Sequence, residues 1–135
     1  MPFRRFGRTG LNIPLLSLGG MRFQQSWSDL DPFEIRPSSQ QQLEGILQKA
    51  VSSGIHHLET ARHYGSSERQ LGRGLKKIPD ENRLLQTKVP PRESPEEFEK
   101  ELEISFQRLG CRRLDLLAIH GLNLPEHLEQ TLRAG

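Results

Sequence analysis

Short hydrophobic segments of this chain alternate with helix-forming segments, and this alternation constrains the fold more than any other feature. The segments with strand character are residues 15–18, 55–59, 84–89 and 114–120. Apolar residues recur at helical spacing in the connections between them, which predicts amphipathic helices. Parallel strands joined by crossover helices form a sheet that helices cover. The sequence therefore predicts an α/β fold with a parallel sheet.

The helix ends are marked by capping residues. We expect helices over residues 38–53, 66–77, 94–109 and from 125 to the last residue, Gly135. Ser94-Pro95-Glu96-Glu97 is a capping box with proline in the first turn, and Gly110 is a typical helix stop. The segment 65–68 also indicates a helix start with local caps.

Two further segments flank the first unit. Residues 3–6 and 12–13 predict a hairpin around the turn at 7–10, which we expect to act as a plug or a lid. Residues 21–37 form a long irregular connection, and such connections are often functional or disordered.

The unit length favours a barrel. The strand ends at Glu59, Lys88 and His120 lie 29 and 32 residues apart, close to the ~30 residues of a βα unit. Four such units are half of an eight-strand barrel, which typically needs ~250 residues. We therefore expect the N-terminal half of a (β/α)8 TIM barrel, with residues 1–135 forming one partial domain truncated before the second half. An open, doubly wound sheet is the competing architecture, but Gly19-Gly20 lacks the glycine spacing of its phosphate-binding turn.

Composition limits the possible partners. Nineteen basic and 17 acidic residues give a net charge of +2, too small for a nucleic-acid or membrane surface, so a small-molecule partner is expected. With Cys111 as the only cysteine, no disulfide framework is possible, which favours a reducing, cytoplasmic location. The four arginines before Asp29 leave a transit peptide as the weaker alternative. Only 33% of the residues are hydrophobic, so we expect marginal stability.

Polar residues end the predicted strands. Alternation along a strand places Glu59, Lys88 and His120 each at the end of one face, where barrel enzymes keep their active sites. Tyr64 follows Glu59 by five residues. A phenol beside a cation and an imidazole is a candidate general acid, because nearby positive charge stabilises the phenolate. Lys88 could supply that charge, and Glu59 would keep the lysine charged and oriented.

Four motifs resemble those of the aldo-keto reductase family. In chain order they are FGRTGL (6–11), ETARHYGSSE (59–68), QTKV (86–89) and DLLAIHG (115–121). The second and fourth are most similar to a bacterial branch of the family, some of whose members carry a C-terminal ferredoxin-like iron-sulfur segment. No iron-sulfur ligands occur in these 135 residues.

The resemblance implies NADPH-dependent reduction of a small carbonyl substrate. Tyr64 would protonate the carbonyl oxygen, Lys88 would assist this tyrosine, and His120 would orient the carbonyl. Glu59 stands where the family usually has aspartate, and its side chain would also lie near the nicotinamide ribose.

Gly20 and Met21 match the end of the family's first strand, beside the nicotinamide. In the family, most cofactor contacts come from the second half of the barrel. We therefore expect the isolated chain to bind NADPH poorly, to turn nothing over, and to self-associate or pair with a complementing second half through exposed sheet edges.

Other interpretations remain open. The chain could be a non-catalytic nucleotide-binding or regulatory protein of the same fold, or an inactive gene fragment. A metal-dependent hydrolase would use His57, His63 and His120, although no His-x-His pair on one strand or helix supports this, and our prediction is no metal site. We expect His57 to be a hydrogen-bonded core residue and Cys111 to be inert.

Overall fold

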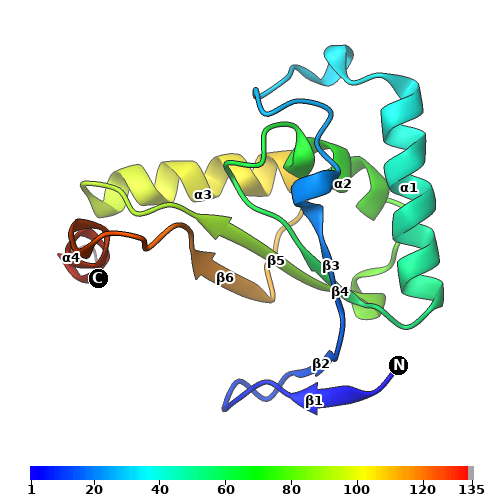
Figure 1. The fold of residues 1–135 in the computed structure, drawn as a ribbon, viewed down its shortest axis with the longest axis horizontal. Coiled ribbons are helices and arrows are strands. Elements are labelled where there is room, and N and C mark those ends of the chain that lie inside the picture. The colour runs from blue at the N-terminus through cyan, green and yellow to red at the C-terminus, as the bar shows by residue number, and fades with distance from the viewer. Residues whose placement is uncertain (134–135) are drawn as a thin grey trace.

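The central sheet contains four parallel strands in sequence order. A computed structural model describes residues 1–133 and places β3 (Ser17–Gly19), β4 (His57–Glu59), β5 (Leu84–Val89) and β6 (Leu116–Ile119) side by side (Figure 1). The predicted parallel sheet is confirmed. The three shorter strands begin later than expected or end earlier, whereas β5 has the predicted bounds.

The helices follow the predicted order. They are α1 (Pro37–Ser52), α2 (Ser67–Leu75), α3 (Pro95–Leu109) and α4 (Pro125–Arg133), and the expected continuation to Gly135 lies outside the described residues. At the start of α3 the Glu97 N–H donates to Ser94 Oγ at 3.3 Å, and Gly110 ends the helix with a φ of 61°. The Ser94 cap and the Gly110 stop are therefore confirmed, whereas the described residues show no return bond from the Ser94 N–H to the Glu97 side chain, which a full capping box requires.

The core lies between the sheet and the first three helices. Leu85, Thr87 and Val89 alternate along β5 and are buried toward the helices, as period-two alternation requires. Helix α2 packs between α1 and α3 (Figure 1). Burying one leucine contributes about 1.5–3 kcal/mol, so the leucine cluster accounts for much of the stability. Its members are Leu43, Leu47, Leu58, Leu71, Leu75, Leu85 and Leu109.

The other face of the sheet carries polar side chains. The His57 ring is hydrogen-bonded on both nitrogens, through Nδ1 to Ser17 Oγ at 2.7 Å and through Nε2 to Gln86 Oε1 at 2.9 Å. Burial lowers the pKa of His57, so the ring stays neutral near pH 7. The expectation of a hydrogen-bonded core histidine is confirmed.

The N-terminal hairpin lies at the amino end of the sheet. Strands β1 (Phe3–Arg5) and β2 (Asn12–Pro14) pair antiparallel below the start of β3 (Figure 1). The Phe3 ring stacks on the His56 ring with 6.2 Å between centroids. The predicted hairpin is confirmed, and it lies away from the carboxyl ends of the sheet strands.

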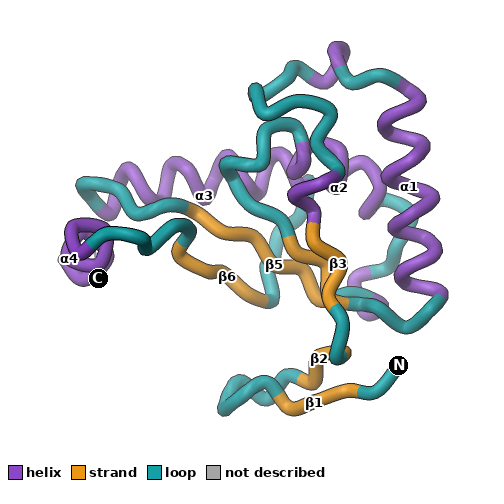
Figure 2. The backbone as a smooth tube through the Cα atoms, in the orientation of Figure 1, coloured by secondary structure: helices purple, strands orange, loops and turns teal. Residues whose placement is uncertain are grey.

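The long connection between β3 and α1 is ordered by its contacts with α2 (Figure 2). It contains 3-10 turns at Gly20–Arg22 and Pro32–Glu34. The Gln25 N–H donates to Ser66 Oγ and Gln70 Oε1, each at 2.9 Å. The expected capping of α2 by the Ser66 side chain is therefore wrong. The Ser66 hydroxyl bonds to the long connection and accepts no hydrogen bond from an N–H group of the first helical turn.

The strands β3 and β6 form the two edges of the sheet. Several apolar side chains on β6, α4 and the segment between them are exposed, namely Leu117, Leu122, Leu124, Leu128 and Leu132. Among residues 1–133, no helix combines the length and apolar character needed to cross a bilayer.

Candidate active site

The carboxyl ends of the strands bring four predicted residues together. Glu59 is the last residue of β4, Lys88 is the penultimate residue of β5, and His120 directly follows β6. Tyr64 lies in the turn between β4 and α2. Parallel neighbours end at the same edge of the sheet, so chain segments far apart in sequence converge there.

Tyr64 lies between a cation and an imidazole. The Lys88 ammonium forms an ion pair with the Glu59 carboxylate and lies over the face of the Tyr64 ring, 4.7 Å from its centroid. The His120 ring packs edge-to-face with the Tyr64 ring, with 5.3 Å between the ring centroids and an interplanar angle of 89°. A cation over an aromatic face and an edge-to-face ring pair are both favourable. The four residues thus form one connected cluster.

The cluster is half-buried, and this tunes its charges. Burial lowers the pKa of Lys88, whereas the Glu59 carboxylate beside it favours the charged ammonium. The pKa of His120 is lowered by burial first, then by the positive charge of Lys88 and by His63. His120 is therefore a neutral imidazole at pH 7. Its Nδ1 atom is buried with no hydrogen-bond partner in the described part of the chain.

The first strand end is free of side chains next to Glu59. Gly19 pairs in register with Glu59, and Gly20 is buried so closely that a Cβ there would lie 2.9 Å from the Glu59 carbonyl oxygen. Met21 is exposed, and the Glu59 side chain is 20% exposed. The partly exposed Glu59 carboxylate thus lies beside a strand end that carries no side chains.

An ion-pair network that we did not predict supports the turn carrying Tyr64. Arg62 is only 12% exposed and lies 2.9 Å from Glu101 on α3, 3.6 Å from Asp29 and 3.9 Å from Glu68 on α2. Asp29 also pairs with Arg108, which ties the long connection to α3. These contacts join four separate segments around the base of the Tyr64 turn.

The centre of this network is a buried carboxyl group. Glu68 is completely buried, accepts a hydrogen bond from Thr87 Oγ1 at 2.7 Å, and has its pKa raised by burial. In the sequence, the only sign of this pair is that Arg62 and Glu68 flank Tyr64 within one motif. Charged residues at a helix start are usually solvated, and only the packing of α2 against α3 buries this pair.

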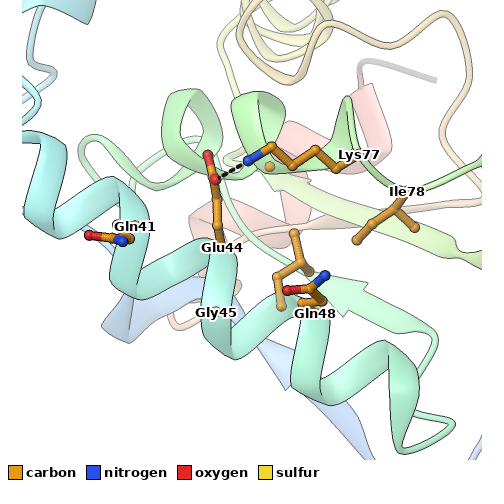
Figure 3. A pocket seen from close by; sticks show the side chains of 8 residues that line it. Gln41, Glu44, Gly45, Gln48, Lys77 and Ile78 are labelled. Carbon is orange, nitrogen blue, oxygen red and sulfur yellow. Dashed lines mark hydrogen bonds and ion pairs between the residues drawn. The ribbon is translucent and has the colours of Figure 1, made fainter.

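Among the hollows of the described structure, one lies away from the cluster and another borders it. One, of about 380 Å³, runs between α1 and the residues that follow α2, where Lys77 and Glu44 pair at 2.6 Å (Figure 3). None of the four clustered residues lines it. The other adjoins His120 and has a volume of about 300 Å³. Residues 1–133 contain no group of three or more side chains arranged to hold a metal ion.

The comparisons with known proteins agree on one family. A sequence model described as the aldo/keto reductase family matches residues 15–134. A thermostable aldo-keto reductase in complex with the inhibitor epalrestat superposes with a TM-score of 0.77 at 26% identity, over 98% of this chain and 49% of that chain. A putative aldo-keto reductase from Pseudomonas aeruginosa has a TM-score of 0.77 at 28% identity, over 94% of this chain and 51% of that chain.

A more distant structure shares the fold. An aldo-keto reductase from Klebsiella pneumoniae in complex with NADPH has a TM-score of 0.65 at 19% identity, over 92% of this chain and 42% of that chain. This chain spans about half the length, or less, of the structures it matches. Its four βα units correspond to the N-terminal half of a TIM barrel, and the chain belongs to the aldo/keto reductase family.

Proposed function

We propose that this chain provides the proton-transfer half of an NADPH-dependent carbonyl reductase. The observation that carries the proposal is the contact of the Tyr64 ring with both the Lys88 ammonium and the His120 ring. A phenol whose ring contacts a cation and a neutral imidazole can give its proton to a carbonyl oxygen, because the nearby positive charge stabilises the resulting phenolate.

Each residue has a distinct role in this proposal. Tyr64 is the general acid, and Lys88 favours the phenolate through its charge. Glu59 holds the lysine ammonium against the cost of burial. His120 would orient the carbonyl oxygen through a ring N–H, since a neutral imidazole has one donor and one acceptor nitrogen.

In this proposal the cofactor would bind at the end of β3, beside Glu59. NADPH supplies the hydride when it is bound. Gly20 and Met21 would border the nicotinamide, and the partly exposed Glu59 carboxylate would accept a hydrogen bond from a ribose hydroxyl. The adenosine end would be held by a second half of the barrel, in the same polypeptide or in another chain. Such a half would also cover the exposed leucines of β6 and α4.

The test is NADPH oxidation in the presence of an aromatic aldehyde. It compares wild type with Tyr64→Phe, both in the 135-residue chain and in the longest protein that its gene encodes. We expect the 135-residue chain to bind NADPH weakly and the longer protein to oxidise it only when Tyr64 is present. Oxidation that survives in Tyr64→Phe would rule out the proton-transfer role, and nucleotide binding without any turnover would indicate a regulatory protein.

A further inference from the structure

A basic hollow adjoins the reaction centre. It lies where the segments after β5 and after β6 approach each other and has a volume of about 300 Å³. One arginine and three histidines line it, together with two prolines and a glycine; the charged or titratable members are His63, Arg92, His120 and His127. His120 therefore belongs both to this basic hollow and to the cluster around Tyr64.

The charge around the basic hollow is not balanced. No carboxylate lines it. The nearest one paired with Arg92 is Glu101, at 2.7 Å, but Glu101 also pairs with Arg62 at 2.9 Å. Asp29 and Glu68 also pair with Arg62, but Asp29 is shared in turn with Arg69 and Arg108. The connected network therefore has four guanidinium groups and three carboxyl groups, an excess of positive charge that includes the arginine at the basic hollow. An anion placed there would restore the balance.

Hydrogen-bond donors converge on the same space. Arg92 reaches His63 Nε2 at 3.4 Å, which leaves the other ring nitrogen of His63 as a donor. Burial and, next in size, the charge of Arg92 lower the pKa of His63. The His63 imidazole beside Arg92 is thus neutral near pH 7, and an anion that neutralised the arginine would favour its protonation.

We propose that the basic hollow binds the anionic group of the substrate, a carboxylate or a phosphate attached near the carbonyl carbon. This assignment rests on the proposed function, because it is His120 that links the anion to the carbonyl that Tyr64 protonates. Carbonyl compounds that carry such a group are therefore preferred over neutral aldehydes.

The test uses anion binding and needs neither NADPH nor turnover. The side-chain NMR signals of the five histidines are followed while inorganic phosphate or acetate is added, in separate titrations, to well above the millimolar Kd typical of one small anion. We expect the His63 and His120 signals to shift with saturation toward the protonated form, while those of His56 and His57 stay constant. The two titrations decide between phosphate and carboxylate.

Two variants and one control make the test specific. Arg92→Met should weaken the anion about tenfold or more, since it removes a charged hydrogen-bond donor. His63→Gln, at an exposed position, should also weaken it and covers the case in which loss of the Glu101 pair impairs folding. The control is Arg113→Met, because Arg113 also pairs with a carboxylate, Asp115, but lies outside the basic hollow.

Shifts that do not saturate, or that are the same in Arg92→Met and Arg113→Met, would overturn the proposal. Tyr64→Phe provides the link to the proposed function. A Tyr64→Phe protein that binds the anion normally but reduces no carbonyl compound separates the basic hollow from the proton-transfer step. Equal turnover of neutral and anionic aldehydes by the full-length enzyme would contradict the role of the basic hollow in substrate choice.

Discussion

The Glu59 carboxylate and the Lys88 ammonium form an ion pair between two neighbouring parallel strands, at the end where both strands deliver side chains to the same face. Each side chain is about one-fifth exposed, so water screens the pair only in part. This pair keeps the lysine ammonium charged at its position over the face of the Tyr64 ring.

Replacing Glu59 by glutamine should lower the pKa of Lys88 further. Burial already lowers it from an ordinary value of 10.5, and the variant removes the charge that opposes this effect. We expect a further fall of about one unit or more, measured by carbon-13 NMR of labelled lysines. Glu44→Gln is the control, because its partner Lys77 is 70% exposed and should barely respond. An unchanged Lys88 titration in Glu59→Gln would refute the pairing.

Tyr64→Phe should reduce the rate of carbonyl reduction by about 10²–10⁴-fold, the range for loss of a general acid. The phenylalanine ring keeps the contacts with Lys88 and His120, so NADPH affinity should be unchanged. Steady-state NADPH oxidation and a fluorescence titration measure the two quantities separately. A variant that lost affinity but kept its rate would show that the tyrosine only packs.

Stability should decrease as the pH falls below about 6.5. The pKa values of His57, His63 and His120 are lowered in the folded protein, mainly by burial. The unfolded chain therefore takes up protons at a pH where the folded protein does not, which favours unfolding. Carboxylates with lowered pKa, such as Glu101, act only nearer pH 4.5 and below.

Urea unfolding between about pH 7.5 and 5.5 measures this histidine effect. It is done in the Glu68→Gln background, because burial raises the pKa of Glu68 and its protonation would act in the opposite direction as the pH falls. His57→Gln should flatten the pH dependence, because it removes one of the three imidazoles. A free energy of unfolding that increases as the pH falls from about 7.5 to 5.5 would mean that the fold does not protect the histidines from protonation.

The buried pair of Arg62 and Glu68 should matter for stability. Glu68→Ala removes the acceptor of the buried Thr87 hydroxyl and leaves a cavity, and should cost about 2–5 kcal/mol. Glu68→Gln keeps the acceptor for Thr87 and should cost about 1 kcal/mol. Glu103→Ala, at an exposed site of α3, is the control and should change stability by less than about 0.5 kcal/mol. Denaturant titration orders the three variants.

A side chain at Gly65 should destabilise the protein strongly, because it would collide with the long connection. This steric cost can be measured separately from the cost of the positive φ angle. Its φ is +52°, and a Cβ would lie 2.7 Å from Trp27 Cα. Gly7 has nearly the same φ, +55°, but no atom within 4 Å of its Cβ position. Gly7→Ala should cost about 1–2 kcal/mol, and Gly65→Ala about 1–3 kcal/mol more, as measured by urea unfolding. Equal costs would show that the long connection moves freely away from Gly65.

Much of the fold could be predicted because its signals are local. The Ser94 cap, the Gly110 stop and the apolar periodicity of α3 all lie within one segment and need no partner to be recognised. The spacing of Glu59, Lys88 and His120 predicted their convergence, since parallel strands of similar length must end together.

The contacts that support the site could not be predicted in the same way. Ser66 has the sequence of a helix cap, but its hydroxyl accepts from Gln25, forty-one residues away. Asp29 gave no signal in the sequence, because its partners come from the turn after β4, from α2 and from α3.

The sequence by itself determined the strand and helix order and the chemical types at the strand ends, because periodicity and capping act over a few residues. Only the tertiary structure decided that Lys88 lies over the Tyr64 ring, that Glu68 is buried, and that Glu101 serves two arginines. Burial and charge balance depend on which segments pack together, and that depends on the whole chain.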